Sequence, residues 1–402
     1  MLPLIPIILV YAILLFLAPF PLWRSFCAVA YNLAINHDLP IKKRLRLFRH
    51  IILELIISPV FTIAFFIDDI VYRKYKYFEI SAPVFIAGQP RNGTTFLHRT
   101  LSMGDEFFSL KHFEWRFPAI CLWRLMDVLG LRSTIEAISY WPKNPDGENA
   151  QKMHKNCLGD FEEHGIFFEE RFYHHYFLLR RYPFNELFPL ISSFKKLSDK
   201  QKQKMLRVFA STVKKAMFYN KTSRLWLTKE NESIELYEMM AEVFPDARYI
   251  FIVRTSDHFM KSYVNLSITS TMAKTGINPM DIDGWNESNI EFRRNECIKM
   301  LPFYKKVTNT NTAVAITYEN LMSDIPNTVG FIYKKLGLSI TDEYKKKLYE
   351  LQHSQARRDS GYRNENRSFT GFEFFDSFVK DIDRQYQQEF STHIEMHEGQ
   401  GH

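Results

Sequence analysis

The pattern of apolar and polar positions changes near residue 77. The first 76 residues are dominated by two apolar stretches. Leu2–Leu22 holds no charged residue over 21 positions, about the ~20 residues that span the hydrocarbon core of a bilayer. Ile51–Ile67 is interrupted by one Glu and one Pro, which indicates an interfacial, re-entrant or buried helix. The pattern predicts a membrane anchor over residues 1–76 and a globular domain over residues 77–402.

Four short apolar runs rich in β-branched and aromatic residues punctuate the globular part, and each is followed by a segment of helical character. The runs predict strands at Val84–Ala87, Leu225–Thr228, Arg248–Arg254 and Thr312–Thr317. Strands that alternate with helices are typical of a parallel sheet, with ligands at the carboxyl ends of the strands. We therefore expect an α/β fold, a P-loop-like parallel sheet flanked by helices.

A glycine-rich loop, Gly88–Gly93, separates the first predicted strand from a helix that begins near Thr94. This arrangement directs backbone N–H groups and the positive end of a helix at a phosphate. The glycine spacing matches a nucleoside-triphosphate P-loop, but that motif requires Lys after the second Gly, where this chain has Thr94. The only cation of the loop is Arg91, which favours a different anion, a 5′-phosphate that carries one more transferable group.

The segment Pro90–His98, P-R-N-G-T-T-F-L-H, resembles the P-R-S-G-T-T-x-L loop of sulfotransferases that use 3′-phosphoadenylyl sulfate. Asn92 stands where this family usually has Ser, and Asn231 stands where a K-x-P segment has Pro. Three further segments match the family in order: Lys229 ahead of F-P-D-A-R-Y-I-F-I-V-R, Arg254 with Ser262 eight residues later, and Y-E-N-L at Tyr318–Leu321. The resemblance covers about residues 80 to 390.

The resemblance implies a donor site with a role for each matched position. Arg91 would contact the 5′-phosphosulfate together with the loop residues Asn92, Gly93, Thr94 and Thr95. Arg254 and Ser262 would bind the 3′-phosphate. The resemblance also implies 3′-phosphoadenylyl sulfate as co-substrate, with no metal.

A polar, basic segment near the carboxyl end, Arg357–Gly371, has no apolar periodicity and is typical of a mobile loop or lid. We expect residues 357–367 to close over the nucleotide and to supply Arg367 to it. The alternative is a solvated basic loop.

Transfer to a hydroxyl also requires a general base. Glu114, in an E-x-x-F-P context similar to the family's, is the first candidate, with a purely structural carboxylate as the alternative. His112 is the second candidate, and a structural His is the alternative there. Lys229 would assist the leaving group or the acceptor unless it is a surface Lys at a strand end. The segment Gly159–His164 resembles the family's acidic D-x-x-E-E segment, and its Glu163 and His164 would bind the acceptor unless they lie on a helix surface.

Composition narrows the function classes. The chain has 402 residues, 46% of them hydrophobic, and a net charge of +7, which excludes global disorder and fits an anionic ligand or a membrane face. Its four cysteines form no C-x-x-C pair, so neither a zinc site nor a disulfide scaffold is indicated. No dense basic tract is interleaved with aromatic residues, which argues against nucleic acid as a partner.

Charge near the apolar segment predicts its orientation. Arg24 and the basic residues between Lys42 and Arg49 follow Leu2–Leu22, and the positive-inside rule places such a flank in the cytoplasm. Six N-x-S/T sequons occur, one of them at Asn92 in the loop, where a glycan could not coexist with a nucleotide. We expect a cytoplasmic catalytic domain, with the Golgi lumen as the alternative.

Together these patterns predict a membrane-associated sulfotransferase that acts on a hydroxyl of a carbohydrate, lipid or small molecule. Two alternatives remain at this stage. A nucleotide kinase-like P-loop enzyme would require magnesium, and a non-catalytic membrane protein that kept the fold would bind the nucleotide without transfer.

Overall fold

The computed structural model describes residues 4–19, 23–35, 39–169, 171–172, 180–187, 197–356, 380–386 and 388. Two compact units divide the chain, and each draws on segments far apart in sequence. The first unit contains residues 1–80, 110–223 and 267–288, and the second contains residues 81–109, 224–266 and 289–402. Each unit is described by itself below.

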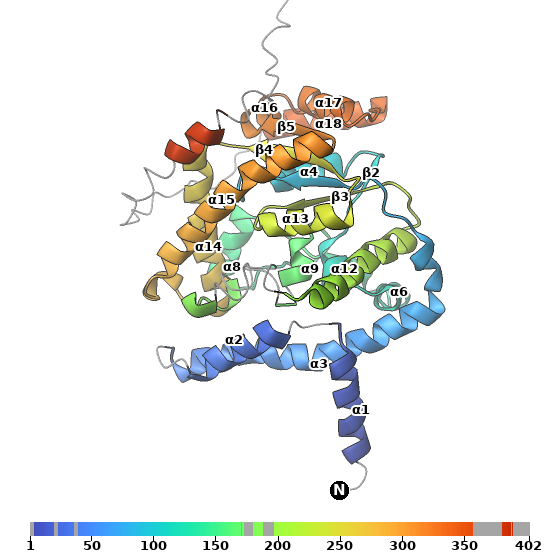
Figure 1. The fold of residues 1–402 in the computed structure, drawn as a ribbon, viewed down its shortest axis with the longest axis vertical. Coiled ribbons are helices and arrows are strands. Elements are labelled where there is room, and N and C mark those ends of the chain that lie inside the picture. Colours follow the sequence, from blue (N-terminus) through green and yellow to red (C-terminus); the bar gives the residue numbers. More distant parts are fainter. Residues whose placement is uncertain are drawn as a thin grey trace, which may run out of the picture. The chain divides into compact units, whose positions relative to one another are not determined.

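The second unit is built on a five-stranded sheet (Figure 1). Its strands are β1 (Val84–Ala87), β2 (Phe107–Phe108), β3 (Leu225–Glu230), β4 (Arg248–Val253) and β5 (Ala313–Thr317). They lie in the order β2-β3-β1-β4-β5 and every neighbouring pair is parallel. Because β1 lies between β3 and β4, the loop after β1 leaves the sheet where the strand order changes direction, the usual ligand position in such sheets. The predicted fold class is confirmed.

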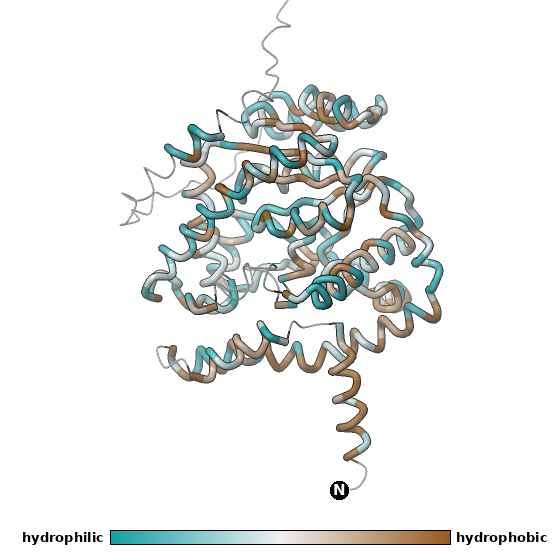
Figure 2. The backbone as a smooth tube through the Cα atoms, viewed as in Figure 1, coloured by the Kyte–Doolittle hydropathy of each residue, from teal (hydrophilic) through white to brown (hydrophobic). Residues whose placement is uncertain are grey.

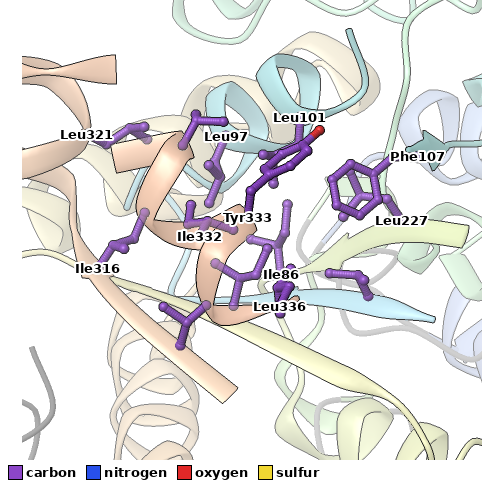
Figure 3. Close-up of a cluster of buried hydrophobic side chains, with 14 of the residues drawn as sticks. Ile86, Leu97, Leu101, Phe107, Leu227, Ile316, Leu321, Ile332, Tyr333 and Leu336 are labelled. Atoms are coloured by element: carbon purple, nitrogen blue, oxygen red, sulfur yellow. The ribbon is translucent and has the colours of Figure 1, made fainter. Parts of the chain in front are cut away.

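Both faces of this sheet are buried, which explains the continuous apolar runs of its strands. The helices of the unit are α4 (Thr94–Leu101), α13 (Ile234–Val243), α14 (Ser256–Thr275), α15 (Trp285–Thr310), α16 (Tyr318–Ser323), α17 (Ile325–Lys335) and α18 (Asp342–Ala356). On one face Ile86 packs among side chains of α4 and α17 such as Leu97 and Ile332 (Figure 3). On the other face the rings of Phe85 and Tyr249 lie 5.7 Å apart.

The strand predictions hold closely. β1 has its predicted bounds, β4 and β5 differ by one residue at an end, and β3 continues two residues further, to Glu230. β2 was not predicted, because a two-residue edge strand carries no detectable hydrophobic period.

The first unit is helical. Its elements are α1 (Leu4–Leu17), α2 (Trp23–Ile35), α3 (Ile41–Val71), η1 (Arg73–Tyr77), α5 (His112–Arg116), α6 (Ile120–Val128), α7 (Arg132–Glu136), α8 (Pro145–Met153), α9 (Gly165–Glu169), η2 (Asn185–Leu187), α12 (Asp199–Tyr219) and η4 (Pro279–Asp281), and the end of α14. A core of its own joins α2 and α3 to residues such as Tyr182 and Leu187. α1 packs on α3, where Tyr11 donates a hydrogen bond to the carbonyl of Leu55 (2.7 Å).

The N-terminal apolar segment differs from the prediction of one span over Leu2–Leu22. α1 ends at Leu17 after 14 residues, a rise of about 21 Å against the roughly 30 Å of a hydrocarbon core. Pro19 lies two residues beyond this end and cannot continue a helix without loss of a backbone hydrogen bond. Among the described residues, α3 is instead the one helix that is long and apolar enough to cross a membrane by length and composition.

Much of α3 is hydrophobic (Figure 2). One side of the helix is buried, whereas the other side is apolar and exposed. Glu54, Ser58 and Asp68 are buried on the packed side. Asp68 pairs with Lys215 (3.0 Å) and accepts hydrogen bonds from the first backbone N–H groups of α6. These contacts fix the end of α3 to the rest of the first unit.

Candidate functional site

The loop after β1 requires its two glycines. A Cβ at Gly88 would lie 2.7 Å from the carbonyl oxygen of Ile252. Gly93 has φ +91° and a Cβ there would lie 2.7 Å from the ring of Tyr318, so both its backbone conformation and its surroundings exclude a side chain. The loop is thereby held tightly against β4 and α16.

Arg91, the cation of this loop, is brought together with two distant residues that the sequence also singled out. Its Nε donates a hydrogen bond to the Ser262 hydroxyl of α14 (2.8 Å). Arg254, at the carboxyl end of β4, donates from Nη1 to the carbonyl oxygen of Arg91 (3.2 Å). Arg91 itself has φ +70°, a left-handed conformation that costs a non-glycine residue about 1–2 kcal/mol. Such strain is found mainly at functional sites.

Two polar groups beside this cluster have unused hydrogen-bonding capacity. The guanidinium of Arg254 lies 4.2 Å from the ring centroid of Tyr318, and its Nε is buried without a hydrogen-bond partner in the described parts of the chain. Asn92 donates weakly to the carbonyl of Ile252 (3.4 Å), and its Oδ1 is also buried and unpartnered there. A buried cationic donor with spare capacity suits an anionic ligand.

The amino end of α4 adds further donors. Its N-cap is Gly93, which offers no side-chain cap, so the N–H groups of Thr94 and Thr95 belong to the set that a helix cannot satisfy internally. Such groups, together with the helix dipole, form an anion site. Asn231, which follows β3, donates to the Thr94 hydroxyl (3.3 Å). The position that departs from the family's usual Pro therefore contacts the loop.

Lys229 lies inside β3, fully buried and paired in register with Ile86 of β1. The sequence predicted it just after a strand, but β3 continues to Glu230. The Tyr237 hydroxyl hydrogen-bonds to the carbonyl oxygens of Ile86 and Glu230. These bonds hold the carboxyl ends of β1 and β3 together next to the loop.

A buried ion pair contacts the loop after β1 through Gln89. The sequence did not predict this pair. Arg293 of α15 pairs with Glu232, with side chains 0% and 1% exposed. The same guanidinium donates to Gln89 Oε1 of the loop (3.0 Å) and to the carbonyl of Asn231 (3.2 Å). Burial alone would lower the pKa of Arg293, but the Glu232 carboxylate outweighs it and the pKa is raised. Arg293 is thus a permanent cation that links the loop after β1 to the loop after β3.

The candidate bases lie in the first unit. Glu114 is buried in α5, where its carboxylate accepts hydrogen bonds from the N–H of Lys111 (2.7 Å) and the amide of Asn220 (2.9 Å). Burial raises the pKa of Glu114, and these two hydrogen bonds oppose it in part. His112 is also buried, with Nδ1 3.3 Å from Asn156 Oδ1.

The predicted site residues therefore fall into three groups. Arg91, Asn92, Gly93, Thr94, Thr95, Lys229, Arg254 and Ser262 share the second unit, and Glu114, His112 and the Gly159–His164 segment belong to the first. Arg367 and the predicted lid at residues 357–367 lie outside the described residues. Across the residues that the structure describes, no three His, Cys, Asp or Glu side chains gather in a way that could hold a metal ion.

Comparisons with known proteins agree with the observed fold. A sulfotransferase family model matches residues 83–342. Among solved structures, the chain is similar to the sulfotransferase STF1 from Mycobacterium tuberculosis H37Rv, with TM-score 0.59 and 15% identity over 94% of this chain and 97% of that one. It is also similar to the sulfotransferase STF9 from Mycobacterium avium, with TM-score 0.60 and 14% identity over 90% and 89%. No curated protein matches in sequence. Because the family model covers more than half of its residues, the chain belongs to the sulfotransferase family.

Proposed function

We propose that this protein transfers a sulfuryl group from 3′-phosphoadenylyl sulfate to an acceptor hydroxyl. The observation that carries the proposal is the convergence of Arg91, Arg254 and Ser262 at the amino end of α4. These residues come from three separate elements and supply two guanidinium groups and a hydroxyl around one loop. That set of donors matches a ligand with two anionic groups.

Each of the three residues has a distinct part in donor binding. Arg91 and the N–H groups of Gly93, Thr94 and Thr95 bind the 5′-phosphosulfate. Arg254 binds the 3′-phosphate through its unpartnered Nε. Ser262 accepts a hydrogen bond from Arg91, so its own O–H proton remains available for a phosphate oxygen.

In the transfer step the acceptor oxygen attacks sulfur as the bond from sulfur to the 5′-phosphate oxygen breaks. The acceptor proton passes to a base, and negative charge builds up on the departing 5′-phosphate. Arg91 and the end of α4 stabilise that charge, by analogy with phosphoryl transfer, where positioning and electrostatics supply most of the catalysis. Lys229 assists at the leaving group, and this chemistry needs no metal.

We expect the Arg254→Ala variant to lose about tenfold or more in affinity for 3′-phosphoadenosine 5′-phosphate. The reason is that a charge-assisted hydrogen bond contributes roughly 1.5–3 kcal/mol. Isothermal calorimetry measures the loss, and Arg248→Ala serves as the matched control. Arg248 begins the same strand but donates to the carbonyl of Leu336 (2.8 Å) at the opposite end. Equal affinity in the two variants would refute the assignment of Arg254.

Glu114 is proposed as the general base, with His112 as the second candidate. We expect Glu114→Gln to lower the transfer rate by about 10²–10⁴-fold while affinity for 3′-phosphoadenosine 5′-phosphate stays unchanged. Gln can replace only one of the two acceptor oxygens, so a thermal unfolding curve must accompany the assay. Glu136→Gln is the control, because Glu136 pairs with Arg132 and Lys111 in the same unit. A folded Glu114→Gln protein with normal transfer would move the role to His112.

We further propose that the protein works at a membrane, with its catalytic part on the cytoplasmic side. One side of α3 is buried and the other is apolar and exposed, which supports a helix that lies along the membrane surface rather than across it. The basic residues at its start would then face the anionic cytoplasmic leaflet. The acceptor is a hydroxyl of a lipid, carbohydrate or small molecule that reaches this surface.

A further inference from the structure

A cationic cavity in the first unit is not used by the proposed transfer reaction. Its volume is about 310 Å³, and its lining includes Arg46, Arg49, His50, Arg116, Arg181 and Lys274. Four of these residues are Arg and one is Lys. None of the described residues that line it is Asp or Glu.

The positive charges of Arg181 and Lys274 are partly compensated by one buried carboxylate, that of Glu169. Glu169, fully buried, lies 3.8 Å from Arg181 and 3.7 Å from Lys274, and accepts a hydrogen bond from the Tyr140 hydroxyl (2.8 Å). His50 Nε2 lies 2.6 Å from Arg181 Nη1, a geometry that requires a neutral imidazole that accepts from the guanidinium. The side chains of Arg181 and Lys274 are therefore held in place by these contacts and are largely buried.

Three cations of the cavity are left without such compensation. Arg46, Arg49 and Arg116 form no ion pair with any residue that the structure describes. Guanidinium groups that surround one cavity repel one another, and an anion between them removes that repulsion. Guanidinium groups also match phosphate oxygens with paired N–H donors. The cavity is therefore shaped and charged for a phosphate-sized anion.

The place of the cavity on α3 indicates where that anion comes from. Arg46, Arg49 and Leu53 lie at the point where the basic start of α3 gives way to its exposed apolar side. Exposed apolar side chains continue along this helix at Ile52, Leu53, Ile56, Val60, Ile63, Phe66, Ile67 and Ile70. From Ile52 to Ile70 the helix rises about 27 Å, more than the roughly 15 Å of one leaflet's hydrocarbon.

We infer that this cavity binds the phosphate headgroup of an anionic membrane phospholipid, whose acyl chains lie beside the exposed apolar side of α3. The headgroup neutralises Arg46, Arg49 and Arg116, and the chains cover apolar surface that is otherwise exposed to water. The cavity shares no residue with the loop around Arg91, and the inference does not depend on the proposed transfer reaction.

Flotation of the intact chain with vesicles tests the inference. We expect binding to phosphatidylcholine vesicles that contain phosphatidic acid to exceed binding to pure phosphatidylcholine vesicles. Arg49→Gln/Arg116→Gln should weaken this binding by about tenfold or more, because two charge-assisted contacts are lost. The matched control is Lys42→Gln/Lys43→Gln, which removes the same charge from the start of α3 but not from the cavity. Thermal unfolding verifies that both variants fold.

Three outcomes would overturn the inference. Equal losses in the two double variants would mean that unspecific attraction between a basic helix and an anionic surface accounts for binding. Unchanged binding in Arg49→Gln/Arg116→Gln would mean that the cavity takes no headgroup. Displacement of the protein from vesicles by millimolar inorganic phosphate at constant ionic strength would mean that the site takes a free anion rather than a lipid.

Discussion

The Arg91→Ala variant is expected to lose about 100- to 1000-fold in the rate of sulfuryl transfer, the usual cost of one preorganised donor at a developing charge. Arg91 is the only cation of the loop, and Ser262 and Arg254 hold it in position. The rate is measured with radiolabelled donor and a membrane lipid extract as acceptor. Arg224→Ala is the control, because Arg224 belongs to the same unit but is half-exposed and pairs with Asp105.

A second variant separates catalysis from stability at this position. Arg91→Gly removes the same side chain and also relieves the left-handed backbone, whose cost is about 1–2 kcal/mol. We therefore expect Arg91→Gly to unfold at a temperature equal to or above that of the wild type, although its transfer rate is as low as that of Arg91→Ala. Near-normal transfer in either variant would show that the loop does not hold the reacting group.

The largest loss of stability is expected from Arg293→Met. This change removes the guanidinium that pairs with the buried Glu232 carboxylate. Loss of one partner of a buried ion pair costs about 3–5 kcal/mol, a large share of the 5–15 kcal/mol that stabilises a typical domain. Urea titration of the intact chain measures the loss. The paired variant Arg293→Met/Glu232→Leu should recover most of it, because removal of both charges is often neutral.

A third variant, Arg293→Lys, tests whether the hydrogen bonds of Arg293 support the loop after β1. Arg293→Lys keeps the charge but cannot reach Gln89, Glu232 and the carbonyl of Asn231 with one planar fork. We expect a smaller loss of stability there, together with weaker binding of 3′-phosphoadenosine 5′-phosphate because the loop loses its support. A loss below about 1 kcal/mol in Arg293→Met would contradict the assignment of a dry, buried ion pair.

The sequence predicted the part of the site that is local along the chain. The run Val84–Ala87, the glycine loop and the helix that follows form one continuous unit, and each signal depends on neighbouring residues. The resemblance paired Ser262 with Arg254, whereas the hydrogen bond from Arg91 to Ser262, 171 residues away, was not predicted by it or by any local pattern.

What the sequence could not predict depends on contacts between distant segments. Arg293 is 204 residues from Gln89 and lies in a helix whose polar sequence looks like any solvated surface. The end of α1 at Leu17 could have been predicted, because Pro19 is a local signal in the sequence. The prediction of one span gave more weight to the high hydropathy of the whole segment. The buried polar side of α3, with Asp68 paired to Lys215, also has no local signature.

Transfer of radiolabelled sulfate from 3′-phosphoadenylyl sulfate by the intact purified chain tests the central claim most directly. Lipid, carbohydrate and small-molecule extracts serve as acceptors, with a metal chelator present. The account predicts a labelled product that requires the wild-type protein, appears without magnesium and falls about 100-fold or more in Arg91→Ala. A protein that binds 3′-phosphoadenosine 5′-phosphate but labels nothing in any extract, or that transfers only with magnesium, would contradict it.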